Sequence, residues 1–149
     1  MMKRAVLCFA LLFCLTAVSS AAETVYAART TPVFSSPGGA ELGRIYAGAA
    51  LSAEAETDGF RRIRLAGLSG FAEASRLSVR QERDESISAQ VYSPYGTETV
   101  VLRSAPSDSC SAVSILRAGE KVRVLGVFGR FRFVKAQAGS GFLSSDEMN

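Results

Sequence analysis

The sequence contains neither histidine nor tryptophan. Histidine is the usual general base of nucleophilic triads and the commonest protein ligand of zinc, so its absence excludes Ser–His and Cys–His catalysis and most zinc centres. Pairs of carboxylates are another hydrolytic device. The acidic residues here are scattered, and we expect solvated surface charges at Glu54, Glu56, Asp58, Glu73, Asp146 and Glu147. We therefore predict a protein that is not an enzyme and holds no metal or cofactor.

Long apolar runs are equally scarce, and the one that exists lies at the N-terminus. Lys3 and Arg4 precede an apolar run over residues 5–18, and four small residues follow at 19–22. This order is typical of a secretory signal peptide, with cleavage after Ala22 or Ala21. The run is shorter than the roughly 18 to 20 residues that a spanning helix needs. We expect residues 1–22 to be removed, leaving a periplasmic or secreted protein without stable membrane insertion.

Cysteine is nearly absent from the expected mature chain. Cys8 and Cys14 lie in the leader, and each follows a bulky residue where lipoprotein processing requires a small one, so a lipid anchor is not expected. Cys110 is then the only thiol, and one thiol cannot form an intramolecular disulfide. A chance free thiol and an intermolecular disulfide both stay open for Cys110.

Excess charge is also missing. The chain carries a formal net charge of +3, but Lys3 and Arg4 belong to the leader, and 15 basic residues then face 14 acidic ones. A near-neutral chain offers no general electrostatic attraction for polyanions. Nucleic acid is therefore not an expected partner.

The chain does contain an internal repeat. A shift of 71 positions pairs Ala47-Gly48 with Ala118-Gly119, and Phe60-Arg61 with Phe131-Arg132. Turn glycines and core apolar residues recurring in the same order indicate an internal repeat. We predict two units, residues 23–79 and 90–149, joined by a charged linker over 80–89.

Each unit shows short alternating runs separated by Gly, Pro and Ser, with no clean helical periodicity. Residues 121–127 and 131–135 predict two antiparallel strands around a turn, and 50–56 and 60–65 predict the equivalent pair. Thr57-Asp58-Gly59 favours a tight turn in the first pair. The fold class expected is all-β.

The second unit resembles the bacterial SH3-like domain. The resemblance rests on the loop at residues 101–107, the Gly-centred turn into an alternating strand at 116–124, the strand at 131–134 and the closing Ser140-Gly141-Phe142-Leu143. The first unit matches more weakly. This resemblance implies two tandem small SH3-like β-barrels after a cleaved signal peptide. Because such domains often accompany cell-wall peptidases and amidases, it also implies an accessory binding module for peptidoglycan or another envelope polymer.

Phenylalanine occupies the positions where this family usually shows tryptophan, and phenylalanine has no indole N–H with which to hold a polar ligand. We expect Phe71 and Phe142 to be core residues, and we expect Phe60 and Phe131, beside hairpin turns, to be partly exposed.

Arginines crowd the two equivalent strands, with Arg62 and Arg64 on one and Arg132 on the other. Guanidinium groups pair with carboxylates and stack on rings. The alternative is a solubilising strand face with cross-strand acidic partners. The candidate ligand-binding residues are Phe60, Arg62, Arg64, Tyr92, Arg103, Phe131 and Arg132. The expected partner is a cell-wall glycan or peptide bound through two weak sites; the alternative is another envelope protein held by an adaptor.

Overall fold

The computed structural model describes residues 21–149, which fold as an all-β protein without any α-helix in that range. Nearly all of the expected signal peptide, residues 1–20, lies outside the described residues. The strands are β1 (Glu23–Ala27), β2 (Thr31–Phe34), β3 (Glu41–Ile45), β4 (Ala50–Thr57), β5 (Phe60–Leu65), β6 (Leu68–Glu73), β7 (Leu77–Ser78), β8 (Ile87–Gln90), β9 (Thr99–Arg103), β10 (Ala112–Arg117), β11 (Lys121–Phe128), β12 (Phe131–Ala136) and β13 (Gly139–Ser144). Two short 3-10 turns, η1 (Ala74–Arg76) and η2 (Ser145–Glu147), follow β6 and β13.

The internal repeat of the sequence is also a repeat of strands. Strands β4, β5 and β6 recur 71 positions later as β11, β12 and β13 with identical lengths, and η1 recurs as η2. The strand pairings recur as well: β1 pairs with β4 in the first part of the chain, and β8 pairs with β11 in the second. Both hairpins expected from the alternating runs are confirmed.

The segment expected as a linker ends in a strand. Ile87–Gln90 forms β8, which pairs antiparallel with β11 through residues such as Ala89 and Val122. Strand β8 pairs with β11 as β1 pairs with β4, so β8 is described together with the second half. Below, the first half means residues 23–79 and the second half residues 87–149.

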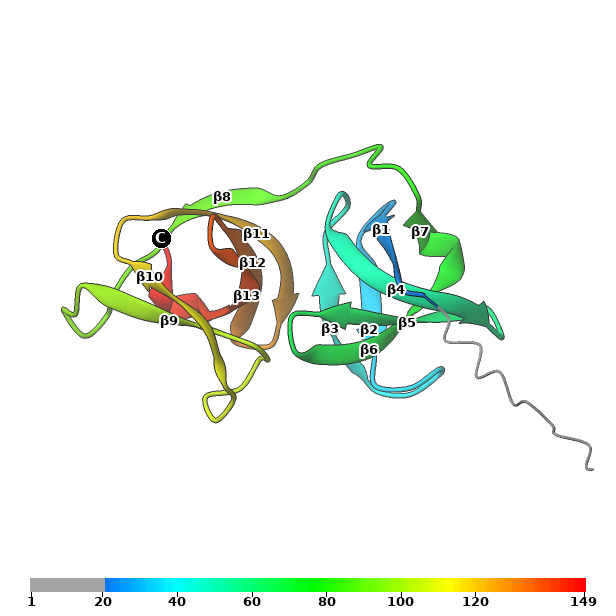
Figure 1. Cartoon of the computed structure of the whole chain (residues 1–149), viewed down its shortest axis with the longest axis horizontal. Coiled ribbons are helices and arrows are strands. Elements are labelled where there is room, and N and C mark those ends of the chain that lie inside the picture. Colours follow the sequence, from blue (N-terminus) through cyan, green and yellow to red (C-terminus); the bar gives the residue numbers. More distant parts are fainter. Residues whose placement is uncertain (1–20) are drawn as a thin grey trace, which may run out of the picture.

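The two halves are joined into one sheet by backbone pairing between β3 and β11, and they lie side by side (Figure 1). Gly126 pairs with Ile45 and Val127 with Arg44, and the Tyr46 N–H donates to the Leu125 carbonyl at 2.7 Å. Two further backbone bonds cross the boundary, from the Gly67 N–H to the Ser104 carbonyl at 2.7 Å and from the Glu85 N–H to the Ala47 carbonyl at 2.9 Å. These bonds fix the halves against each other.

Two glycines allow β3 and β11 to approach. A Cβ on Gly126 would lie 2.5 Å from the Arg44 carbonyl oxygen, and one on Gly43 would lie 2.4 Å from the Val127 carbonyl oxygen. Neither neighbour is a flexible side-chain tip, so any larger residue forces backbone movement. At the equivalent positions of the repeat stand Ala55 and Ser114. The glycines therefore belong to the contact between the halves and not to the fold of each half.

The buried side chains form two clusters, and one of them crosses the boundary. The second-half cluster contains Leu102, Leu116 and Val134 among others. The first-half cluster takes in five residues of the second half: Leu125, Phe128, Phe131, Phe133 and Phe142. A unit of this size buries little apolar surface by itself, so docking adds burial that neither half achieves alone.

Replacing Gly126 with alanine is expected to destabilise the protein by about 1 to 3 kcal/mol, because the new Cβ collides with the Arg44 carbonyl. Ala55→Gly, the reverse change at the equivalent position of the first half, is the matched control and should cost about 0.5 to 1 kcal/mol from backbone entropy alone. Urea unfolding followed by circular dichroism measures both. Hydrogen exchange at the Tyr46 amide should accelerate only in Gly126→Ala; equal acceleration in both variants would contradict the role of the glycine.

Candidate functional site

An outward-facing row of side chains crosses three neighbouring strands of the first half. Phe34 on β2 lies opposite Phe71 on β6, and Phe71 lies opposite Arg62 on β5. Successive side chains of a strand point to opposite faces. Because Val33 and Ile63 are buried in the core, their neighbours Phe34 and Arg62 point away from it.

Phe60 completes this surface. Its ring meets that of Phe34 edge to face, with centroids 6.3 Å apart and an interplanar angle of 80°. Phe34, Phe60 and Phe71 are each half-buried, Arg62 is exposed, and the core clusters contain none of the four. We call Phe34, Phe60, Phe71 and Arg62 the aromatic face.

The equivalent row in the second half is closed. It runs from Arg103 on β9 through Phe142 on β13 to Phe133 on β12. Phe133 and Phe142 are 2% and 0% exposed, since they belong to the cluster that the two halves share. The repeat therefore uses one surface in two ways, covered in the second half and open in the first.

This difference corrects two expectations about the phenylalanines. Phe131 is buried at 5% exposure rather than partly exposed, because it packs into the shared cluster. Phe71 is only half-buried and is not a core residue. The first half covers the equivalent Phe142, but within residues 21–149 nothing covers the aromatic face in the same way. Phe142 is buried and Phe60 is partly exposed, as the sequence predicts.

Arg103 serves the structure of the second half rather than an open site. Its guanidinium pairs with the Glu147 carboxylate at 2.6 Å and lies 5.7 Å from the centre of the Phe131 ring. Glu147 also accepts the Ser144 N–H at 2.9 Å and is 8% exposed. The expectation that Glu147 is a solvated surface charge is wrong, because Arg103 compensates its burial.

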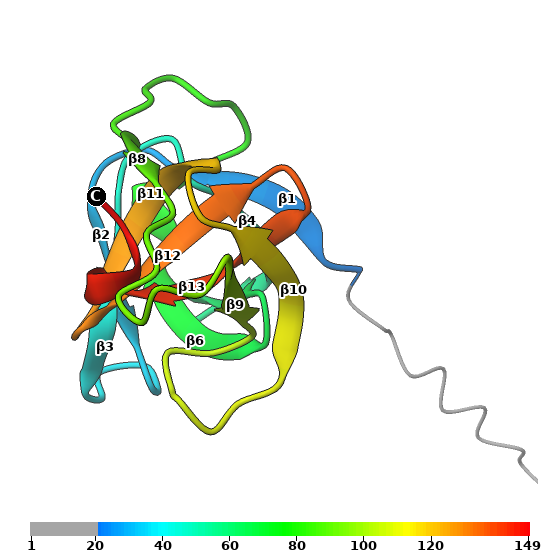
Figure 2. The ribbon, with the colours of Figure 1, turned by 90° about the vertical axis from the view of Figure 1, so that its left-hand side faces the viewer.

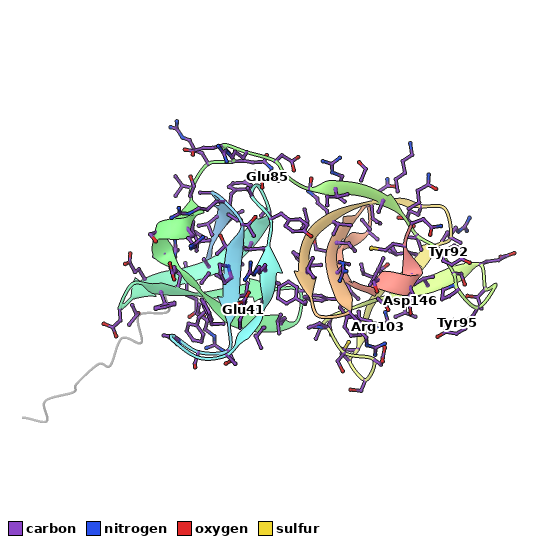
Figure 3. All side chains as sticks on the ribbon, turned by 180° about the vertical axis from the view of Figure 1, so that it is seen from behind. Glu41, Glu85, Tyr92, Tyr95, Arg103 and Asp146 are labelled. Atoms are coloured by element: carbon purple, nitrogen blue, oxygen red, sulfur yellow. The ribbon has the colours of Figure 1, made fainter. Side chains whose placement is uncertain are left out.

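The remaining candidate residues do not meet in one place. Arg64 and Arg62 line a small depression of about 150 Å³ on the first half. Arg132 donates to the carbonyls of Gly129 and Phe131 at 2.9 and 3.0 Å on the second half. Tyr92 is 47% exposed just after β8; Figure 3 shows it with Tyr95 at the outer end of the second half. The structure brings Phe60, Arg62 and Arg64 to one outward face of β5, and it brings Arg103 against the buried Phe131.

The thiol of Cys110 is half-buried and donates to the carbonyls of Ala105 and Ser107 at 3.2 and 3.0 Å. It is a free cysteine within the loop between β9 and β10. Among residues 21–149, no cluster of Asp, Glu or Cys has the arrangement of a metal site.

A second surface, which the sequence analysis did not single out, lies on the second half. Arg123 on β11 and Lys135 on β12 line two cavities of about 790 and 400 Å³. Lys121 lines the larger cavity, and the smaller one is also lined by Tyr26, Gly48 and Ala50 of the first half. Arg123 and Lys135 line both cavities, so the two form one continuous depression, here called the cationic groove. The alternation of Lys121, Val122 and Arg123 was visible in the sequence, but the cavity depends on β8 and on residues 81–86, which distant parts of the chain place there.

Asp84 faces this groove from the segment between the halves. Hydrogen bonds from the hydroxyl and the backbone N–H of Ser86, together with the charge of Arg123, lower the pKa of the Asp84 carboxyl. Its carboxylate lies 3.6 Å from the Arg123 guanidinium. Asp84 is therefore ionised at neutral pH and faces one of the three cations.

No helix within residues 21–149 has the length and apolar character required to cross a bilayer. No family model and no curated protein matches the sequence. Among solved structures, the chain is similar to NlpC1 from Trichomonas vaginalis, with 13% identity and a TM-score of 0.41 over 90% of this chain and 48% of that one. NlpC2 from the same organism is similar at 12% identity and a TM-score of 0.39, over 87% and 48% of the respective chains. The chain thus spans about half the length of each, and similarity at this level supports no conclusion about function.

The different burial of two equivalent phenylalanines yields a stability prediction. Phe131→Ala should cost about 3 to 5 kcal/mol, because it opens a cavity in the shared cluster. Phe60→Ala removes a half-buried ring and should cost about 1 kcal/mol. Thermal and urea unfolding of both variants test this order; equal losses would mean that the aromatic face is as well packed as the contact between the halves.

Proposed function

We propose that the chain is an exported, non-catalytic binding protein of the cell envelope, that each half is a small SH3-like barrel, and that the ligand is peptidoglycan. The aromatic face carries this proposal. Three half-buried phenylalanine rings beside the exposed Arg62 offer apolar stacking surface next to a fixed positive charge. Sugar rings and peptide planes stack on aromatic faces, and a guanidinium pairs with the carboxylates of an acidic wall peptide.

One polymer site per chain fits the structure better than two weak sites. The surface of the second half that corresponds to the aromatic face is covered by the first half, and Phe131 there is buried. Tight binding to a polymer then requires avidity from several chains rather than from the two halves of one chain.

Two observations support a binding role over catalysis. The sequence has no histidine to act as a general base. The buried acid, Glu147, has a structural role, since its carboxylate pairs with Arg103 at 2.6 Å and accepts the Ser144 N–H at 2.9 Å. These features favour recognition without turnover.

A second candidate function, a protein adaptor, is favoured by strand β10. This strand ends the sheet and presents Val113 and Ile115 at 44% and 64% exposure, beside Val101 at 42% on β9. Figure 2 shows β10 on the outer side of the second half. An uncovered apolar edge strand is a template for pairing with a strand of another protein.

Removing the aromatic face should abolish polymer binding. The double variant Phe60→Ala with Arg62→Glu is expected to lower co-sedimentation with purified peptidoglycan sacculi by about tenfold or more, because it removes both ring area and charge. Arg117→Glu is the control, since this exposed residue changes the net charge equally and lies on β10, far along the sheet from β5.

Retention of binding by the Phe60 and Arg62 double variant would overturn the aromatic face as the polymer site. Absence of pelleting by the unaltered protein at low salt would overturn peptidoglycan as the ligand. Loss of pelleting only in Arg117→Glu would place the polymer site on β10 instead of on the aromatic face.

Export is tested separately. The full-length chain expressed in a Gram-negative host should appear in the periplasm with an N-terminus at Glu23 or Ala22, because residues 1–22 have the order of a signal peptide. N-terminal sequencing of the periplasmic fraction identifies the cleavage site. A variant with both Ala21→Phe and Ala22→Phe should accumulate uncleaved, because neither cut then follows a small residue. Ala28→Phe, beyond the site, should be processed normally.

A further inference from the structure

The cationic groove places like charges directly across a strand pair. Arg123 on β11 is the register partner of Lys135 on β12, and Lys121 stands two residues from Arg123 on the same strand, so all three point to one face. Like charges opposite one another destabilise a sheet. A bound anion would relieve this repulsion.

Only one of the three cations is neutralised within the molecule. The Arg123 guanidinium donates to the hydroxyls of Ser86 and Ser88 at 2.7 to 2.9 Å and faces Asp84. Across residues 21–149, Lys121 and Lys135 make no ion pair and no side-chain hydrogen bond. Two ammonium groups therefore border the cavity with their full charge available.

The repeat shows that the fold does not require these charges. The equivalent positions in the first half are Ala50, Ser52 and Arg64, which together supply a single cation. The depression at that place is much smaller, at about 150 Å³, and also contains Glu54. The charges and the large cavity are thus specific to the second half.

The lining of the groove combines charge with apolar and amide groups. Ala89 and the aliphatic stems of Lys121 and Lys135 provide apolar surface, and Gln90 and Gln137 provide amide donors and acceptors. A phosphate polymer has no apolar side chains that could pack against the apolar groups. A peptide uses both, because its side chains contact the apolar groups and its backbone bonds the amides.

We propose that the cationic groove binds an extended acidic peptide segment of a partner protein, with carboxylates at alternate positions. Lys121 stands diagonally across the strand pair from Lys135, a separation of about 7 to 8 Å. Carboxylates two residues apart on an extended peptide are separated by about 7 Å, which matches these two unpaired ammonium groups. Asp84 provides an internal example, because its carboxylate already faces Arg123 from a non-helical segment. This site is separate from the aromatic face and does not depend on polymer binding.

The test is fluorescence anisotropy with a labelled acetyl-Glu-Val-Glu-Val-Glu-amide peptide and the chain from residue 23 to 149 in 50 mM salt. We expect binding that weakens steeply with added salt, and no binding of the peptide with glutamine in place of glutamate. The double variant Lys121→Glu with Lys135→Glu should raise the Kd by about tenfold or more. Lys121→Gln with Lys135→Gln is a milder version, and thermal melting verifies that each variant is folded.

Arg29→Glu with Arg80→Glu is the matched control, since both residues are exposed and outside the groove, and it should bind as the unaltered protein does. The Phe60→Ala with Arg62→Glu variant should also keep peptide binding, which separates this site from the aromatic face. No binding of the glutamate peptide in 50 mM salt, equal loss in the Arg29 and Arg80 control, or tighter binding of inorganic polyphosphate to the same lysines would each overturn the proposal.

Discussion

The close backbone approach of β3 and β11 is the constraint on which the rest of the molecule depends. A Cβ at Gly43 or Gly126 would collide with a carbonyl oxygen of the opposite strand. Because both residues are glycine, the two strands can pair and the sheet continues from one half into the other. This approach brings Phe128, Phe131 and Phe133 against residues of the first half, and it buries apolar area that a half of this size lacks. Stability and the orientation of every surface follow from that contact.

The contact makes two similar halves unequal. A row that reads Phe34, Phe71, Arg62 in the first half reads Arg103, Phe142, Phe133 in the second. The second row is covered by the first half, and its Arg103 is tied to Glu147. Within residues 21–149 the first row has no such cover, and it is the surface that we propose for the ligand. Duplication therefore produced one structural face and one open face from the same strands.

The same glycines set the contact between β3 and β11 apart from its counterpart in the repeat. A contact between β10 of one chain and β4 of another would place Ser114 and Ala55 where Gly43 and Gly126 stand. Side chains at these positions block the close approach. Strand β10 consequently ends the sheet with Val113 and Ile115 exposed, and natural sheets normally protect such an edge.

The sequence by itself determined the all-β class, both central hairpins and the offset of the repeat, because alternation of apolar residues and turn glycines are local signals. It also named Phe60 and Arg62, two residues apart on one predicted strand, as candidate ligand-binding residues. It did not determine that Phe131 is buried, that Phe71 is half-exposed or that Glu147 is paired, since those outcomes depend on which surface the other half covers. The cationic groove likewise needed tertiary structure, because β8, β12 and Asp84 meet Arg123 only after the chain has folded back. Burial between repeated units is a long-range property: Phe133 at the position equivalent to Arg62 is an apolar signal, but the sequence does not say which surface covers it.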